Sequence, residues 1–295
     1  MKKTLLFILL AVFITGAVIF GLTLNARYKN TLTSISVAVK ENEDDEFTKE
    51  TIEEAKQTPF ILLLFGISNR EALNDPGKAD TIMLALINPE LGEISLISIP
   101  RDAYVDVPGY GKDKINSAYF LGKADLLKKT IESWLEIDIH AYASINFEGF
   151  IDLVDLVGGI RVNVPRDMKY NDPVDGTNID LKKGEQVLDG KNALDFVRFR
   201  KSSDGRHASD YERIERQQQA LTVLSNNLAS IRMIARVHSI MDILSANVET
   251  SLTVEELDLL MKKFYSTDMQ EIQTTSLQGG GHLINGVWEN IIRFV

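Results

Sequence analysis

Cysteine is absent from this 295-residue chain, and histidine is scarce. Without cysteine the chain can have no disulfides, no Fe–S clusters, no thiolate nucleophile and no cysteine ligand for zinc. The four histidines, His140, His207, His238 and His282, are scattered and lack the paired spacing of metal ligands. The remaining options are a metal bound by oxygen ligands or no metal at all.

Basic charge is also in short supply. Lys and Arg number 32 against 42 for Asp and Glu, which gives a net charge of −10 at pH 7. This balance disfavours general nucleic-acid binding, because that function requires a basic face. No Walker loop or nucleophile elbow occurs, and Gly109-Tyr110-Gly111 lacks the third glycine of a dinucleotide-binding loop. Phosphate chemistry would therefore depend on a local cluster of cations.

The chain begins with an apolar run from Leu5 to Leu24, which follows a pair of lysines. About 20 apolar residues suffice for a helix to cross a bilayer. The alternative is a cleaved signal peptide, whose apolar region is usually about 7 to 15 residues long and ends at an A-x-A-like site. Leu24 and Ala26 would flank the best cut, which is a poor match. The sequence predicts an uncleaved signal-anchor at residues 5–24, with residues 1–4 in the cytoplasm.

The rest of the chain divides into two parts. Residues 25–58 are polar and include the acidic run Glu41–Glu46, which is typical of a solvated spacer. We expect this spacer to be extracytoplasmic. Residues 59–295 show one composition and no internal repeat, so they predict a single domain.

Within this domain, short apolar runs alternate with turns and with helical patterns. Continuous apolar runs predict strands covered on both faces, and a repeat of apolar residues every three or four positions predicts helices. This mixture predicts an α/β fold, a three-layer α/β/α domain. The expected strands span residues 60–67, 81–87, 94–99, 141–145 and 160–164, and the expected helices span residues 124–135, 147–156 and 210–231, the last with Asp210 at its cap.

Arginines stand where expected elements end. Arg101 and Asp102 follow Pro100 at the end of a buried strand, on the rim of the sheet where α/β proteins bind ligands. Arg198 and Arg200 are two positions apart, so they would point to one side of an extended segment.

The expected helix at residues 210–231 carries a further group of polar residues. Arg213, Arg216 and Gln217 lie at positions i, i+3 and i+4, so they share one face of the helix. Cations outnumber acids over residues 198–216, which makes this segment a positive island on an acidic protein. The alternative interpretation is ion pairing with neighbouring glutamates on an exposed helix.

Asp80 stands at the start of the expected strand at residues 81–87. A carboxylate beside several arginines suits a phosphate site with Mg²⁺, because the acid binds the hard cation and guanidinium groups bind phosphate oxygens bidentately. Considered alone, Asp80 would be a turn cap.

The chain resembles the LytR-CpsA-Psr family of the Gram-positive cell envelope over roughly residues 60–288. Several ordered motifs at compatible spacing carry the resemblance, namely Lys78–Leu84, Ser98–Asp102, Lys114–Ala118, Leu153–Ile160, Leu188–Gly190, Val197–Arg200 and Asp210–Gln218.

The resemblance implies an extracytoplasmic α/β/α domain with a mixed central sheet, anchored in the cell membrane by one span. It implies a phosphotransferase that moves an anionic glycopolymer, of the teichoic acid or capsular polysaccharide type, from undecaprenyl pyrophosphate to the muramic acid C6 hydroxyl of peptidoglycan. It also implies Mg²⁺ and an apolar tunnel for the polyprenyl chain. The alternatives are a non-catalytic or hydrolytic binder of such lipid-linked glycans, and a transcriptional regulator, which the acidic charge disfavours.

The resemblance also implies roles for individual residues. Arg101, Arg198 and Arg200 would bind the pyrophosphate during catalysis, and Asp80 would be one of two Mg²⁺ acids. We expect Asp102 to orient Arg101 or to act as a base. Further contacts to the pyrophosphate or the substrate are expected from Arg70, Lys78, Lys114, Arg213, Arg216 and Gln217.

Three positions depart from the family pattern. Ser68 stands where the family usually has the first metal acid. Lys78 stands where arginine is common, and lysine binds phosphate as a point charge without a bidentate fork. Glu212 stands where glycine is common and adds an acid beside the arginines. We therefore expect Asp80, water and the substrate to be the main ligands of Mg²⁺.

Overall fold

The fold is taken from a computed structural model. No helix in the part of the chain that it describes is both long enough and apolar enough to cross a membrane. The expected signal-anchor at residues 5–24, most of the expected spacer, and Arg70 lie outside the described residues. The described residues are 26–36, 60–68, 77–88, 93–172, 177–200, 209–228, 236–257, 260, 272–284 and 287–292.

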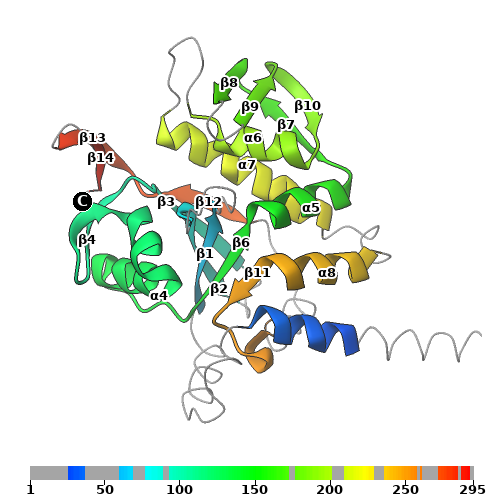
Figure 1. The fold of residues 1–295 in the computed structure, drawn as a ribbon, viewed down its shortest axis with the longest axis horizontal. Coiled ribbons are helices and arrows are strands. Elements are labelled where there is room, and N and C mark those ends of the chain that lie inside the picture. Colours follow the sequence, from blue (N-terminus) through cyan, green and yellow to red (C-terminus); the bar gives the residue numbers. More distant parts are fainter. Residues whose placement is uncertain are drawn as a thin grey trace, which may run out of the picture.

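A mixed six-stranded sheet forms the centre of the molecule (Figure 1). Strand β2 pairs antiparallel with both β1 and β3, and β6 pairs antiparallel with β11. Strand β1 pairs parallel with β6, and β3 pairs parallel with β12. The mixed α/β fold expected from the sequence is therefore confirmed. In the order β11-β6-β1-β2-β3-β12, the strands are Val248–Thr250, Ala141–Asn146, Phe60–Ile67, Ala79–Asn88, Glu93–Ile99 and Gln273–Ser276.

Both faces of this sheet are covered, as the continuous apolar runs predict. Helix α4 (Ile115–Leu135) packs Leu127 and Ile131 against Leu63 and Leu84 on one face. The expected helix at residues 124–135 is only the second half of α4, because Gly122 and Lys123 have non-helical backbone angles and break the apolar periodicity.

On the other face, apolar side chains of the sheet, including Phe60 and Leu96, pack with Leu221 of helix α7 (Asp210–Leu228). Hairpin β4 (Tyr104–Val107) with β5 (Gly111–Lys114) and hairpin β13 (Gly279–Ile284) with β14 (Val287–Ile292) lie at the periphery.

A second lobe, residues 147–200, lies beside the sheet and has its own apolar core (Figure 1). Val154, Ile160 and Phe196 are fully buried in it, and α7 contributes Ala220 and Leu224. Helix α7 therefore belongs to both cores. The lobe contains helix α5 (Phe147–Val157), strands β7 (Ile160–Val164), β8 (Met168–Asp172), β9 (Thr177–Leu181) and β10 (Gly184–Leu188), and helix α6 (Gly190–Arg198).

The segment that leads to Arg198 is helix α6, so the condition of an extended segment around the two arginines is not met. Asp189 caps the start of this helix, because its side chain accepts a hydrogen bond from the backbone N–H of Asn192 at 2.8 Å. Arg198 is the last helical residue, and Phe199 leaves the helix in an extended conformation. Arg198 therefore lies in the helix and Arg200 lies after its end, so the alternation of side chains along a strand does not apply to them.

The helix at residues 26–35 also differs from the expected solvated spacer. Leu32 and Ile35 are buried, and the Ser36 hydroxyl donates to the carbonyl of Leu252 at 2.6 Å. Arg27 pairs with Asp242 of helix α8 (Val237–Asn247) at 3.2 Å. This part of the expected spacer is packed on the domain because its apolar residues recur at helical spacing.

Candidate functional site

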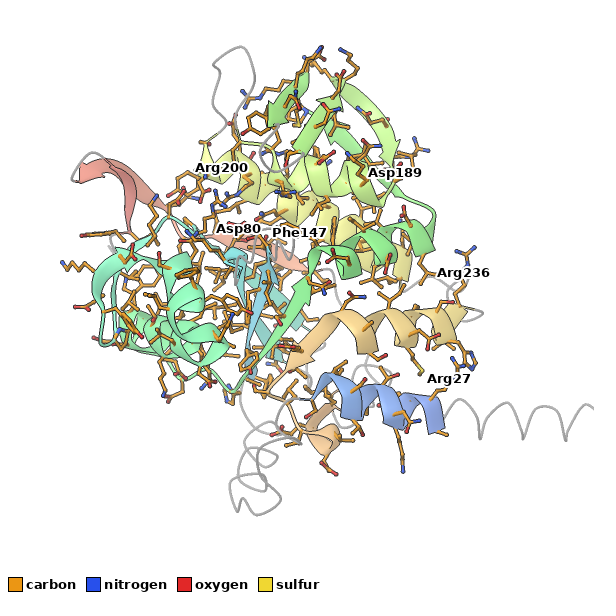
Figure 2. All side chains as sticks on the ribbon, in the orientation of Figure 1. Arg27, Asp80, Phe147, Asp189, Arg200 and Arg236 are labelled. Carbon is orange, nitrogen blue, oxygen red and sulfur yellow. The ribbon has the colours of Figure 1, made fainter. Side chains whose placement is uncertain are left out.

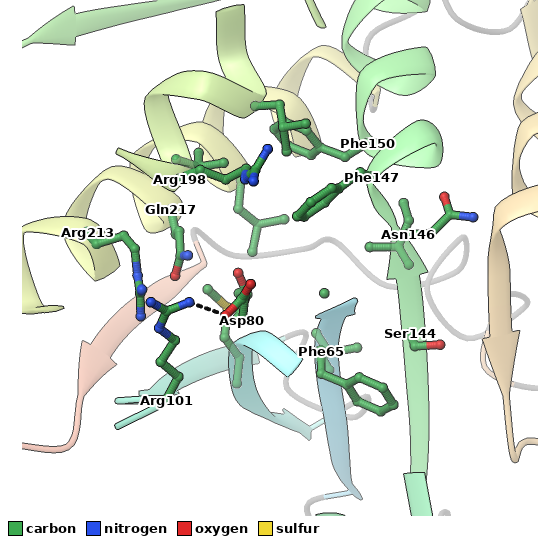
Figure 3. A pocket seen from close by; sticks show the side chains of 18 of the residues that line it. Phe65, Asp80, Arg101, Ser144, Asn146, Phe147, Phe150, Arg198, Arg213 and Gln217 are labelled. Carbon is green, nitrogen blue, oxygen red and sulfur yellow. Dashed lines mark hydrogen bonds and ion pairs between the residues drawn. The ribbon is translucent and has the colours of Figure 1, made fainter. Parts of the chain in front are cut away.

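A cavity of about 790 Å³ lies between the central sheet and the second lobe (Figure 3). Strands β1, β2 and β6 form one wall, and helices α5, α6 and α7 form the other. Figure 2 shows Asp80, Phe147 and Arg200 gathered at this junction, whereas Arg27 and Arg236 lie away from it. Most of the lining is apolar, from Leu64, Phe65, Met83, Ala143, Ile145, Phe147, Phe150, Ile179, Leu194, Val197, Phe199, Leu221 and Val248.

Charged residues line one part of the cavity, namely Asp80, Arg101, Arg198, Arg200 and Arg213, together with the amide of Gln217. Asp80 and Arg101 form an ion pair (dashed in Figure 3). Strands β2 and β3 are antiparallel, so the start of β2, with Asp80, meets the end of β3, after which Arg101 follows. The topology therefore explains how two residues far apart in the sequence become neighbours.

The ion pair keeps Asp80 charged. Burial raises the pKa of Asp80, but attraction to Arg101, the nearby Ser68 hydroxyl and attraction to Arg213 lower it. The net result is a pKa below the ordinary value of 3.8, so Asp80 is a carboxylate at neutral pH.

Arg213 is a buried cation with unused hydrogen-bonding capacity. Its side chain is paired with Asp210, one turn earlier in α7. Burial, with repulsion from Arg101, lowers the pKa of Arg213 to about 10, so the group remains protonated at neutral pH. Within the described residues, the buried Nε–H groups of Arg101 and Arg213 have no hydrogen-bond partner. Both side chains line the cavity, so each arginine has a donor that no other described group uses.

Arg198 stacks on an aromatic ring. Its guanidinium carbon lies 4.7 Å from the centroid of Phe147, the first residue of α5. The Asn146 side chain caps α5 by accepting a hydrogen bond from Gly149 N at 2.8 Å, which fixes where Phe147 stands. A guanidinium over an aromatic ring combines cation–π attraction with N–H donors whose geometry suits phosphate oxygens.

Asp102 binds two cations and does not line the cavity. Its carboxylate accepts a hydrogen bond from Arg200 at 3.0 Å and another from Lys114 at 3.1 Å. Burial raises its pKa, but Arg101, Arg200 and Lys114 lower it, and the net pKa lies below 3.8. A carboxylate held in this way is a weak base, and it orients Arg200 where we expected it to orient Arg101.

The start of α7 differs from expectation at two residues. Ser209, not Asp210, caps the helix: its hydroxyl accepts from Glu212 N at 3.1 Å, and the Glu212 carboxylate accepts from Ser209 N at 2.8 Å. Glu212 also pairs with Arg166 of the second lobe. The acid that departs from the family pattern is thus neutralised within the protein.

Four of the site residues expected from the sequence do not line the cavity. These are Asp102, Lys78, Lys114 and Arg216. The Lys78 ammonium lies 6.0 Å from the ring centroid of Phe120, and Lys114 binds Asp102. Arg216 binds backbone carbonyls at the end of α6.

The aromatic residues of the lining were not predicted from the sequence. Phe147 and Phe150 lie one turn apart in α5, where their spacing is also that of ordinary core residues. Tyr170 reaches the cavity from β8, which the sequence pattern did not predict as a strand. A pattern of aromatic residues alone carries no signal for a lipid cavity.

A mostly apolar cavity with arginines gathered in one part defines a protein that binds an amphiphile with an anionic head group. The comparisons with known proteins place this class in a family. The chain belongs to the LytR_cpsA_psr family, whose family model matches residues 22–293. The resemblance inferred from the motifs is therefore confirmed.

The relatives and solved structures that are similar to this protein align with most of its chain. The polyisoprenyl-teichoic acid–peptidoglycan teichoic acid transferase TagU of Oceanobacillus iheyensis is 38% identical over 237 residues, 78% of this chain and 70% of that protein. The crystal structure of Bacillus subtilis TagV is 32% identical with a TM-score of 0.65, covering 81% of this chain and 92% of the other. The structure of TagT bound to LI-WTA is 26% identical with a TM-score of 0.61, covering 88% and 90%.

Proposed function

We propose that this protein transfers an anionic glycopolymer of the teichoic acid type from a polyisoprenyl pyrophosphate carrier to peptidoglycan. The observation that carries the proposal is the convergence of Arg101, Arg198, Arg200 and Arg213 on one part of a mostly apolar cavity of about 790 Å³. The apolar walls suit a polyisoprenyl chain, and the arginines suit its pyrophosphate. The names of the transferase relatives support the same chemistry.

The reaction is a phosphoryl-type transfer. The acceptor hydroxyl oxygen, that of muramic acid C6, forms a bond to the phosphorus that carries the glycopolymer. The bond from this phosphorus to the bridging oxygen breaks, and the polyisoprenyl phosphate leaves with the electron pair, while the hydroxyl proton passes to solvent. The arginines of the cavity neutralise the charge that develops on the phosphate oxygens.

The residues present fit a substrate-assisted Mg²⁺ site. Asp80 offers one carboxylate to the cavity, and the Ser68 hydroxyl lies beside it. In the described part of the chain, no three acidic or histidine residues are placed so that they could hold a metal ion together. One carboxylate with water and phosphate oxygens suits Mg²⁺, which keeps several waters. When bound, the ion would supply further neutralisation of the pyrophosphate, and Asp80 would hold it together with water and phosphate oxygens.

Replacing Ser68 with aspartate should raise the Mg²⁺ affinity of the lipid-free protein about tenfold, because affinity rises with the number of carboxylate ligands. Isothermal titration calorimetry with Mg²⁺ alone measures this. The Ser68→Asp, Asp80→Asn double variant is the matched control and should lose the gain. The wild-type protein should bind Mg²⁺ weakly alone and more tightly with a short polyprenyl pyrophosphate. Tight binding by the lipid-free wild type would show that another acid completes the site.

We further propose that the domain works on the outer face of the cell membrane, held there by the apolar run at residues 5–24. The acceptor and the lipid carrier of the proposed reaction are both found there. Protease added to intact cells should digest the domain, and the mature protein should retain residues 1–24. A mature N-terminus near Arg27, or protection of the domain in the cytoplasm, would contradict this placement.

A transfer assay with the full chain tests the proposed function. The protein in detergent is mixed with a short-chain polyisoprenyl pyrophosphate glycopolymer and peptidoglycan fragments, and the products are identified by mass spectrometry. We expect muropeptides that carry the polymer through a phosphodiester, together with polyisoprenyl phosphate. Free phosphorylated glycan as the main product would show a hydrolase, and tight lipid binding without any product would show a binding protein.

A further inference from the structure

Arg216 is a buried cation that lies beside the cavity and not in it. Arg216 belongs to helix α7, and the residue is only 3% exposed. Its side chain reaches the end of α6, next to Arg198 and Arg200. Its Nε–H donates to the carbonyl of Phe196 at 2.9 Å, and its Nη2–H donates to the carbonyl of Phe199. Both acceptors belong to the segment that carries Arg198 and Arg200.

These two carbonyls are among the groups that a helix end leaves without intrahelical partners. Phe196 stands two residues before Arg198, and Phe199 stands directly after it. A planar guanidinium that binds both carbonyls fixes the backbone on each side of Arg198 and immediately before Arg200. Its positive charge also suits the negative end of the α6 dipole.

Two aromatic rings also contact the Arg216 guanidinium. The guanidinium carbon of Arg216 lies 6.0 Å from the ring centroid of Phe196 and 5.8 Å from that of Phe199. Both rings are buried. Burial lowers the pKa of Arg216 to about 10, although Glu212 raises it, so the side chain stays charged at neutral pH. A lysine could not replace it fully, because an ammonium lacks the rigid fork that spans two carbonyls.

We propose that Arg216 is a positioning residue, which sets the direction of Arg198 and Arg200 toward the cavity and thereby determines the affinity for the anionic head group of the lipid. This inference rests on the proposed function, since it assumes that the two arginines bind the pyrophosphate. It replaces the direct substrate contact that we expected of Arg216 from the sequence.

The test compares two ligands with the same tail. A short polyprenyl pyrophosphate and the corresponding polyprenol are titrated into the full chain by calorimetry, and the ratio of their Kd values measures the contribution of the head group. We expect Arg216→Lys to weaken pyrophosphate binding about tenfold, the equivalent of one charged hydrogen bond, while polyprenol binding changes less than about twofold.

Gln218 supplies the matched control on the same helix. Its side chain ties α7 to the sheet by donating to Ser98 Oγ at 3.0 Å and to the Thr275 carbonyl at 2.8 Å, away from the α6 end. Gln218→Leu should lower the melting temperature but leave the ratio unchanged. An unchanged ratio in Arg216→Lys, or an equal loss for both ligands in both variants, would overturn the inference.

A double-mutant cycle and a measurement on the wild type complete the test. In the Arg198→Met, Arg200→Met background, Arg216→Lys should cause no further loss of pyrophosphate affinity, because the positioned groups are gone. In the wild type, the Arg216 Nε–H NMR signal should shift less than those of Arg198 and Arg200 when the pyrophosphate binds, whether or not the variants fold. A shift as large as theirs would make Arg216 a direct ligand and overturn the inference. A wild type that binds both ligands equally would refute the proposed function instead.

Discussion

Replacing Arg198 with methionine should lower the rate of glycopolymer transfer at least tenfold while leaving the protein folded. Arg198 lines the cavity from the end of α6 and stacks on Phe147. A charged hydrogen bond to phosphate contributes about 1.5 to 3 kcal/mol, and each 1.36 kcal/mol lost from transition-state stabilisation is tenfold in rate. Methionine keeps an apolar contact with the ring but provides no donor.

Arg161 provides a matched control for this prediction. It is an exposed arginine on β7 of the same lobe and does not line the cavity. Arg161→Met should leave transfer within about twofold of the wild type, as is usual for surface substitutions. Arg198→Lys should fall between the wild type and Arg198→Met, because lysine keeps the charge and loses the bidentate geometry. Normal transfer by Arg198→Met would show that the arginine is structural.

The sequence predicted the central sheet well because its strands are covered on both faces. The runs at residues 60–67, 81–87 and 94–99 became β1, β2 and β3 with only small changes at their ends. The antiparallel pairing of β2 and β3 follows from a short connection rich in turn residues. That pairing brings Asp80 and Arg101 together, so this part of the candidate site could be inferred from local signals.

Helix α6 was not among the helices expected from the sequence, although a signal was available. Asp189 and Gly190 followed by Asn192 and Leu194 form a helix start with a cap, but the helix has only nine residues and its apolar pattern is short. The arginines alternate with aromatic residues, which is also the pattern of a strand. Tertiary contacts decided between the two, since Arg216 binds the carbonyls exposed at a helix end.

The different roles of Arg213 and Arg216 could not be read from the sequence. The two residues lie on one face of α7, and both are buried. Arg213 faces the cavity, whereas Arg216, one turn further along, faces the second lobe. Their spacing is the same as that of any i, i+3 pair, so only the position of the second lobe against α7 distinguishes the arginine that lines the cavity from the one that binds the α6 carbonyls.

The contacts of Glu212 likewise could not be predicted from the sequence. Viewed in the sequence, it adds negative charge to a cationic site. In the structure it caps α7 with Ser209 and pairs with Arg166. The charge of a residue was thus predictable, but its neutralisation by a partner 46 positions away required the fold.

Asp80→Asn should lower transfer at least tenfold but leave the affinity for a short polyprenyl pyrophosphate equal to that of the wild type or higher. In the lipid-free protein the carboxylate is the counterion of Arg101, so it competes with phosphate for that arginine. Asparagine ends the competition, but it also removes the proposed Mg²⁺ ligand. Calorimetry and the transfer assay, both in Mg²⁺, separate the two effects. A parallel fall in affinity and transfer would show that Asp80 acts only by holding Arg101.

The same variant should show a stability difference that depends on pH. The folded-state pKa of Asp80 lies below its ordinary value of 3.8, so the ion pair stabilises the fold at neutral pH and this contribution is lost as the pH falls through the folded-state pKa. Breaking the partly buried pair should cost about 2 kcal/mol at pH 7, between the values for exposed and fully buried pairs. The difference in melting temperature between wild type and Asp80→Asn should therefore shrink as the pH falls from 7 through the folded-state pKa, because a protonated Asp80 is neutral like asparagine. A difference that stays constant over this range would place the stabilising effect of Asp80 in packing and not in its charge.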